Sequence, residues 1–547
     1  MIAAAVAVPM ATASGPLTVT LSNLDAFDRS ALAQSIRAHV SDATGNVATA
    51  TVTYSFSSAD GGTIVVGGET QPGGATPVTG STDSEGHHDL TGIGMGKAGS
   101  VTVVATATTV DGRTATSNPV VVTIDATVGT LYSWGYNAEG QIGADKVGGV
   151  QTTPIARTDG RKYAAVVGSW SALAGIAADG HIYTAGNNGS GPLAMGWYGG
   201  KAGVNDGNRT PQAVGPAGTT DATGVGTPTG VLANVVAAYT GKGCTLDETF
   251  FVSTADGSFW GAGENAGGGF SRKDGSSGGT SDRTFGYTAY APIGVEILAK
   301  NPGRTIRQPA ISGWFRSAYL LDDGTVWNAG RNNYSAFGTG SAVADGKDTY
   351  AAQTVREDGS PLTGIRQIAI TQRTQMYLDA EGKIWGSGTN SWGRMPGFAL
   401  DAKKNFASRL TQPEGKDVRN LWTNGSDGGF YVAETVDGML YAAGANLSGS
   451  ASIGTTATNR MNEWIPVVGV PAGKAIVDIQ FGHDGGLWLF DDGSVYFSGL
   501  NDTGGLGNGT ANGTRVTTMT QVPIPGGKKA ISIAATFWDS YAVVTAD

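Results

Sequence analysis

The chain has 547 residues, of which 40% are hydrophobic and 15% are charged, and its net charge is −10. This length excludes a single small domain, and the apolar content excludes general disorder. The acidic balance argues against a nucleic-acid partner, and because no apolar run is long enough to cross a bilayer we expect no membrane insertion.

The first residues carry only part of an export signal. Residues 2–9 are apolar and residues 11–13 (Ala-Thr-Ala) resemble a cleavage site, but no Lys or Arg precedes them. We therefore interpret residues 1–14 as an export segment or a disordered start. The single cysteine, Cys244, fits a reducing or an oxidising compartment equally, and a lone buried thiol is its simplest interpretation.

Residues 15–127 differ in composition from the rest of the chain. All 12 tryptophans lie at or after Trp134, which places a domain boundary near residues 125–129. Before this boundary, apolar residues such as Val52, Tyr54 and Phe56 alternate with polar ones, as in a strand with one buried face. About seven short strands of this kind predict a β-sandwich.

Five segments of this first region carry a family resemblance, namely residues 17–21, 40–46, 52–56, 82–86 and 98–105. There the sequence resembles a bacterial immunoglobulin-like domain of the invasin and intimin type. Domains of that type are spacers and presenters on bacterial surface proteins. The resemblance therefore implies an extracellular or cell-surface location.

From residue 129 onward a short phrase recurs seven times. It reads Gly, any residue, an apolar residue, an aromatic residue, two further residues and Gly, with Asn two positions later. The copies begin at Gly129, Gly180, Gly257, Gly324, Gly382, Gly438 and Gly493. Five copies start with Asp-Gly, which favours a tight hairpin. Successive copies lie 51 to 77 residues apart, a spacing that indicates an array or a propeller.

Each copy forms part of a larger unit. An apolar strand precedes the turn, for example at residues 317–321 and 487–490, so strand, turn, strand and Gly-rich connection predict one four-stranded blade. The first copy has no preceding strand, and residues 531–547 have no copy after them. We therefore expect the two ends to complete one blade together and to close the ring.

The repeat region also carries a family resemblance. Its segments are Gly135-Tyr-Asn-Ala-Glu-Gly-Gln-Ile-Gly143, residues 481–488 and residues 499–507. They resemble the repeats of the regulator of chromosome condensation family, over residues 129–547, which implies a seven-bladed β-propeller. Because the matching positions are structural glycines, no nucleotide-exchange activity is implied. Exported bacterial members, including a β-lactamase inhibitor protein, bind other proteins through loops on one face.

The predicted fold is all-β, with an immunoglobulin-like β-sandwich over residues 15–127 and a seven-bladed β-propeller over residues 128–547 closed by its two ends. Loops between the first and second strands of the blades are expected on one face. The candidate binding residues there are Trp170, Trp314, Phe315, Arg316, Arg373, Asp427, His483, Asp484, Phe537, Trp538 and Asp539. The alternative is that these aromatic side chains pack between blades as core.

Two long insertions interrupt the repeats. Residues 187–231 contain Trp197 and Tyr198, and this pair makes the first insertion the better interaction candidate. Residues 265–304 are rich in Gly and Ser, which is typical of a flexible flap.

Little in the sequence supports catalysis or metal binding. His483 and Asp484 could form an acid–base pair, but the family resemblance implies a structural histidine in this loop. The sequence also contains a cluster that mixes imidazole and carboxylate groups: Asp83, Glu85, His87, His88 and Asp89. Its spacing matches no known ligand set, so we interpret it as a solvated polar turn. No phosphate loop or dinucleotide fingerprint occurs, and we predict no cofactor and no metal.

These features predict a non-enzymatic, surface-associated binding protein. The sandwich would be a spacer, and the propeller would present its loops to a protein or a glycan, as in an appendage or a virion fibre. Two alternatives stay open: a protein inhibitor that caps a target enzyme, and a hydrolase with Asp484 or Asp539 at the mouth of the channel. The partner and the oligomeric state are not defined by the sequence.

Overall fold

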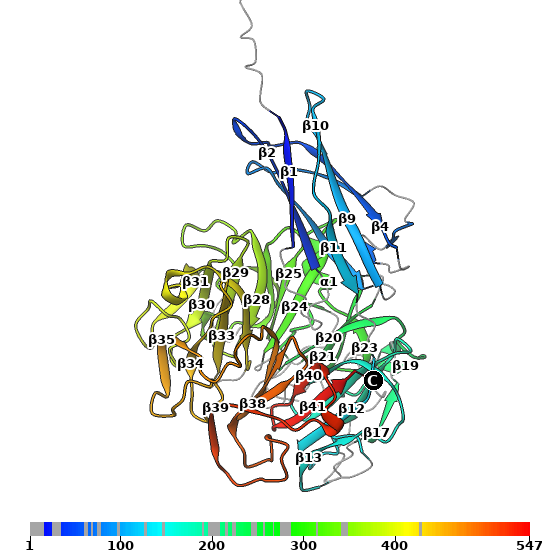
Figure 1. The fold of residues 1–547 in the computed structure, drawn as a ribbon, viewed down its shortest axis with the longest axis vertical. Helices are drawn as coiled ribbons and strands as arrows, with labels where there is room; N and C mark the ends of the chain where they lie inside the picture. Colours follow the sequence, from blue (N-terminus) through cyan, green and yellow to red (C-terminus); the bar gives the residue numbers. More distant parts are fainter. Residues whose placement is uncertain are drawn as a thin grey trace, which may run out of the picture. The chain divides into compact units, whose positions relative to one another are not determined.

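The chain divides into two compact units, one within residues 16–124 and one within residues 128–546 (Figure 1). The computed structural model describes residues 16–23, 34–59, 64–66, 69–73, 78–95, 99–124, 128–144, 148–188, 191–194, 208–213, 217–220, 226–241, 249–254, 257–265, 267–273, 286–312, 316–340, 348–425 and 429–546.

The first unit consists of two antiparallel sheets over one apolar core. One sheet has the strand order β1-β2-β8-β5-β6, with β3 beside β2, and the other has the order β10-β9-β4-β7, with β11 beside β9. Ile36 and Val40 from the first sheet share the core with Val52 and Val103 from the second. The strands are β1 (Thr18–Asn23), β2 (Gln34–Asp42), β3 (Gly45–Asn46), β4 (Thr51–Ser57), β5 (Ile64–Val66), β6 (Glu69–Gln71), β7 (Val78–Ser81), β8 (His87–Met95), β9 (Gly99–Thr108), β10 (Thr114–Thr116) and β11 (Val120–Ile124).

The described residues of the second unit form seven four-stranded antiparallel sheets. Six of them follow the chain: β14 (Tyr163–Gly168), β15 (Ala172–Ala177), β16 (Ile182–Gly186) and β17 (Asn208–Ala213); β20 (Val235–Thr240), β21 (Thr249–Thr254), β22 (Phe259–Glu264) and β23 (Gly286–Pro292); β24 (Ile306–Ser312), β25 (Arg316–Leu321), β26 (Val326–Arg331) and β27 (Asp348–Gln353); β28 (Ile365–Ile370), β29 (Thr374–Asp379), β30 (Ile384–Thr389) and β31 (Lys403–Arg409); β32 (Val418–Thr423), β33 (Phe430–Thr435), β34 (Leu440–Ala445) and β35 (Arg460–Pro466); β36 (Ile476–Phe481), β37 (Gly485–Phe490), β38 (Val495–Leu500) and β39 (Arg515–Gln521).

The seventh sheet combines strands from both ends of the repeat region. It consists of β40 (Ala530–Ala535), β41 (Ser540–Thr545), β12 (Leu131–Tyr136) and β13 (Val150–Ala156), and β12 pairs with β41 (Figure 1, cyan beside red). The first strand of each sheet contacts the first strand of the next, and β40 also contacts β14. At this last contact the Val166 N–H donates to Ser532 Oγ at 3.1 Å.

Side-chain amides join the first strands of neighbouring sheets. Gln308 on β24 donates to the Ile368 carbonyl at 3.2 Å and accepts from the Ile368 N–H at 3.1 Å. Gln367 on β28 makes the same pair of bonds with Leu421 on β32, at 2.9 and 3.0 Å. A primary amide has one donor group and one acceptor, so it satisfies both backbone groups of one residue at once. These bonds fix the spacing of three consecutive sheets.

The recurring phrase forms the third strand of each sheet. Its second glycine has a positive φ; at Gly499, where φ is 122°, a β-carbon would lie within 2.5 Å of Gly485 Cα. The following Asn is buried in each copy, and in six of the seven its Oδ1 accepts the N–H five residues later, as Asn501 does from Leu506 at 3.0 Å. The phrase therefore encodes a strand together with the loop that follows it.

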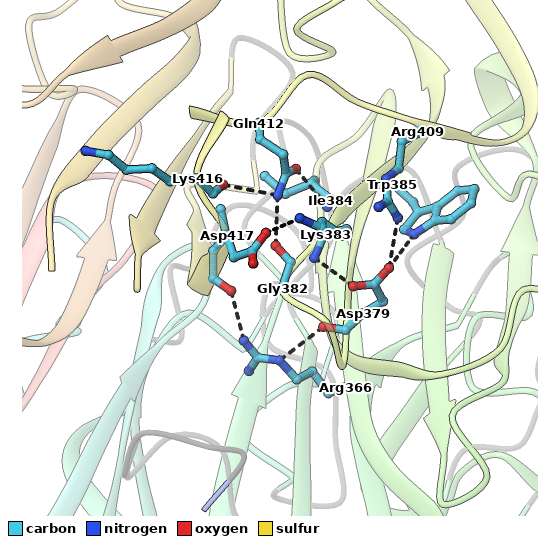
Figure 2. A network of polar contacts seen from close by, with 11 residues as sticks. Arg366, Asp379, Gly382, Lys383, Ile384, Trp385, Arg409, Gln412, Lys416 and Asp417 are labelled. Atoms are coloured by element: carbon cyan, nitrogen blue, oxygen red, sulfur yellow. Dashed lines mark hydrogen bonds and ion pairs between the residues drawn. The ribbon is translucent and has the colours of Figure 1, made fainter. Parts of the chain in front are cut away.

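The hairpins at the other end of the sheets are closed by polar networks, one of which is drawn in Figure 2. Asp379 accepts hydrogen bonds from the Lys383 N–H at 2.7 Å, from Trp385 Nε1 at 2.8 Å and from Arg409 Nη1 at 3.0 Å. The Lys383 ammonium reaches Asp417, which precedes the first strand of the next sheet. The network therefore joins two sheets at the end opposite to the loop at residues 371–373.

Part of the second insertion has regular structure, which differs from the expected flap. Strand β23 and the helix α1 (Val295–Lys300) lie within residues 265–304. Ile293 and Ile297 are buried in the same core as Ile306, and this burial holds the segment in place. In the first insertion β17 pairs with β16, and a small sheet contains β18 (Ala217–Thr220) and β19 (Gly226–Pro228). Within the described ranges no helix is both long and apolar enough to cross a membrane.

Candidate functional site

Three loops between first and second strands meet at one end of the second unit. They are residues 169–171, 482–484 and 536–539, which belong to three different sheets. The Phe537 N–H donates to the Ser169 carbonyl at 2.9 Å, and the His483 N–H donates to the Phe537 carbonyl at 2.9 Å. Backbone bonds between loops place their side chains at fixed positions relative to one another.

Four ring side chains gather where these loops meet, and we call them the aromatic patch: Trp170, His483, Phe537 and Trp538. The Trp170 ring stacks on Phe537 with centroids 4.0 Å apart, and Trp538 meets Trp170 edge to face at 5.5 Å. The His483 and Phe537 rings have centroids 4.7 Å apart. Trp538 is 46% exposed, whereas Phe537 is buried beneath the others. The patch therefore presents an exposed indole on a buried aromatic base.

Carboxylates surround the base of the patch. Asp539 is buried and accepts the N–H groups of Asp484 and Gly485, at 3.2 Å each, and the Tyr541 hydroxyl at 2.9 Å. Asp484 pairs with His483 Nδ1 at 2.8 Å and also accepts the Ser448 hydroxyl. These bonds attach the loop at residues 482–484 to the loop that contains Trp538.

The three titratable groups of this cluster have shifted pKa values. Burial, together with the negative charge of Asp484, raises the pKa of Asp539 to about 7. The hydrogen bond to Asp484 raises the pKa of His483. Burial alone would raise the pKa of Asp484, but the hydrogen bonds from His483 and Ser448 outweigh it and lower that pKa.

The predicted site residues divide into three groups. Six come together in and below the patch: Trp170, His483, Asp484, Phe537, Trp538 and Asp539. Two, Arg316 and Arg373, lie on other loops. Five lie outside the described residues: Trp197, Tyr198, Trp314, Phe315 and Asp427.

The two arginines have different surroundings. Arg316 is buried, with 1% exposure, and its guanidinium donates to the Thr371 carbonyl of the neighbouring sheet. Burial lowers the pKa of Arg316 to about 10. In this position it joins two sheets instead of offering a surface contact. Arg373 lies over the Tyr334 ring, 4.4 Å from its centroid, and is partly exposed.

Sequence reasoning missed two residues of this site. Tyr136 lies beside Trp538 with ring centroids 6.1 Å apart, and Ser448 donates to Asp484. Tyr136 directly follows the second glycine of the first phrase. Its position beside the loop at residues 536–539 could have been predicted from the expected pairing of the two ends of the repeat region. Ser448 follows a different phrase, and no local signal connects it to residue 484.

A cavity of about 180 Å³ lies between the first strands of six sheets. Gln308 and Gln367 line it, but their amides are bonded to neighbouring backbones. The volume is below the roughly 300–1,000 Å³ typical of small-molecule pockets. This cavity is therefore a weaker candidate than the aromatic patch.

The polar turn of the first unit does not gather all five of its side chains at one point. His88 faces inward and its Nδ1 lies 2.9 Å from the Tyr54 hydroxyl, while Asp89 pairs with Arg37 at 2.8 Å. Across the ranges that the structure describes, no group of three or more His, Cys, Asp or Glu side chains is arranged to hold a metal.

No protein-family model matches the sequence. Solved structures do resemble the chain. Human WBSCR16 gives a TM-score of 0.59 at 14% identity, over 76% of this chain and 100% of that chain. Prp20p from Saccharomyces cerevisiae gives 0.55 at 13% identity, over 78% and 93%. Yeast RCC1 (Prp20) bound to Kap60 gives 0.57 at 14% identity, over 78% and 90%.

These likenesses support an RCC1-type β-propeller. At 13–14% identity they concern the fold alone. The resemblance of the repeats to the regulator of chromosome condensation family is thus confirmed at the level of fold. The immunoglobulin-like character of the first unit stays a prediction.

Proposed function

We propose that this protein is a non-enzymatic binding protein whose propeller presents the aromatic patch to a partner protein. The observation that carries the proposal is the exposed Trp538 on its buried aromatic base. Tryptophan is the residue type most often found at the energetic centre of protein interfaces. Three loops bonded to one another hold it, so little conformational entropy is lost on binding.

The similar structures include two that concern protein binding. Prp20p was characterised with respect to Gsp1p and histones, and yeast RCC1 (Prp20) is bound to Kap60. They support a protein in preference to a glycan as the partner. Their partners are not carried over, because the likeness concerns the fold alone.

The proposal includes a seven-bladed propeller closed by its two ends, which makes the loop face rigid. The mixed sheet of β12, β13, β40 and β41 and the contact between β40 and β14 support it. It also includes an immunoglobulin-like first unit that acts as a spacer and an extracellular or cell-surface location, which the sequence resemblance supports.

The test is capture of partners by the immobilised full chain. We expect the wild type to retain a protein that the Trp170→Ala/Trp538→Ala double variant loses. The matched control is Met439→Ser, because Met439 is 49% exposed on the hairpin at the other end of its sheet. Equal capture by the double variant and the control would refute a binding role for the patch.

The hydrolase alternative makes a different prediction. If Asp484 or Asp539 were catalytic, activity on a substrate panel would vanish in Asp484→Asn or in Asp539→Asn and survive in Trp170→Ala/Trp538→Ala. Asp539 is bonded to three protein donors below the surface, which favours a structural role for it.

A further inference from the structure

Two histidines that are 48 positions apart in sequence face each other on the first unit. The register of strands β2 and β8 places His39 directly opposite His87. Ile36, Ala38 and Val40 point into the core, so His39 lies on the outer face of the sheet. Residues directly opposite in an antiparallel pair have β-carbons about 4.5–5.5 Å apart, which brings their side chains into contact.

The distance between the two rings suits a shared metal ion. Their centroids are 4.9 Å apart and their planes are inclined by 50°. With metal–nitrogen bonds of about 2.0–2.1 Å, two imidazoles on one ion have ring centres roughly 4.5–5.2 Å apart for bond angles between a right angle and a tetrahedral one. The observed separation of the ring centres therefore falls within the range for two imidazoles on one ion.

The polar contacts of the two rings indicate which nitrogens can bind the ion. His39 Nε2 lies 2.9 Å from Asn46 Oδ1, an acceptor, so this nitrogen carries the proton and Nδ1 keeps its lone pair. His87 Nδ1 lies 3.8 Å from a Glu85 carboxylate oxygen, which is too far for a hydrogen bond, so either nitrogen of this ring can carry the proton and the other can bind the ion. A carbonyl or carboxylate behind a ligating histidine is the usual support of a metal site.

The charges around the pair also favour a cation. Glu85 is exposed, and Asp83 accepts the His87 N–H at 2.9 Å. Arg37, on the same face, donates two hydrogen bonds to Asp89, at 2.8 and 2.9 Å. Asp83, Glu85 and Asp89 against Arg37 give these four side chains a formal charge of −2.

We propose that His39 and His87 form a binding site for a transition-metal ion that prefers imidazole, such as Zn²⁺ or Cu²⁺. The protein supplies two ligands, and water completes the coordination. Imidazole binds Cu²⁺ more tightly than Zn²⁺, and it binds Ca²⁺ and Mg²⁺ poorly because these hard cations prefer oxygen.

The test is calorimetric titration of the full chain with ZnCl₂. We expect one site that weakens at least tenfold in His39→Gln and in His87→Gln. The matched controls are His181→Gln and His483→Gln, because each of these histidines has a carboxylate beside it but no second histidine opposite. Both controls should bind Zn²⁺ like the wild type.

Three results would overturn the proposal. The first is equal Zn²⁺ binding in His39→Gln, His87→Gln and the wild type. The second is no Zn²⁺ binding by the wild type. The third is displacement of Zn²⁺ by equimolar CaCl₂, which would place the ion on the carboxylates of Asp83 and Glu85. Far-UV circular dichroism verifies that both variants are folded, and each is tested independently.

Discussion

The Trp170 indole lies flat on the Phe537 ring, with centroids 4.0 Å apart and planes 10° from parallel. The two residues are far apart in sequence, and they belong to the loops of two different sheets. Their stacking places Trp538, which follows Phe537 directly, at the surface. Substitutions of Phe537 should therefore affect mainly the stability of the protein, and substitutions of Trp538 should affect mainly partner binding.

Replacing Phe537 and replacing Trp538 should have different effects. Phe537 is 4% exposed, so Phe537→Ala leaves a cavity and should lower the free energy of unfolding by about 3–5 kcal/mol. Trp538 is 46% exposed, so Trp538→Ala should cost under about 1 kcal/mol while it reduces partner binding. Urea denaturation measures the first effect. A large loss of stability in Trp538→Ala would contradict this assignment.

Stability should depend on pH through Asp539. An unfolded aspartate has a pKa near 3.9, whereas burial and the charge of Asp484 raise the pKa of folded Asp539 to about 7. Because the folded state holds this proton more tightly, the contribution to stability is complete below about pH 4 and is lost as pH rises through about 7. The slope is at most about 1.4 kcal/mol per pH unit.

Asp539→Asn should remove this slope. The variant should be more stable than the wild type at pH 8 and similar to it at low pH, as measured by urea denaturation across that range. His483 also has a raised pKa, and its contribution is likewise lost as pH rises, so His483→Gln is the control. An unchanged slope in Asp539→Asn would assign the effect to His483 or to other groups.

The contribution of the asparagine that follows each recurring phrase can be measured by comparing two copies within this chain. Asn501 Oδ1 accepts the Leu506 N–H at 3.0 Å, whereas Asn446 Oδ1 has no such partner. Asn501→Ala leaves a backbone N–H unpaired and should cost about 1–3 kcal/mol. Asn446→Ala should cost less. Equal losses in chemical denaturation would show that the side-chain carbonyl is not the stabilising group.

The side-chain amide bonds between the first strands of neighbouring sheets should contribute to the stability of the folded protein. Gln367→Leu removes both bonds to Leu421 and leaves the backbone N–H and carbonyl of Leu421 unpaired. We expect this to lower the free energy of unfolding by about 1–3 kcal/mol. The control is Gln521→Leu, because Gln521 is exposed on the last strand of its sheet. Thermal unfolding followed by calorimetry should show a lower midpoint for Gln367→Leu alone.

Local periodicity was enough to predict the second and third strands of the sheets and the turns between them. Each phrase contains its own turn glycine, its alternating apolar residues and its buried asparagine, and all of these act within about ten residues of one another. That is why the third strands and the loops after them could be read from the sequence, and why the expected RCC1-type propeller fold agrees with the solved structures.

The contacts that loop residues make with neighbouring sheets could not be predicted from local sequence patterns. Whether Phe537, Asp539 or Arg316 is exposed depends on loops and strands that belong to neighbouring sheets. In the first unit, the pairing of His39 with His87 depends on the register of two strands. Sequence patterns encode which side chains alternate along one strand, whereas burial and long-range contact arise only when separate strands pack together.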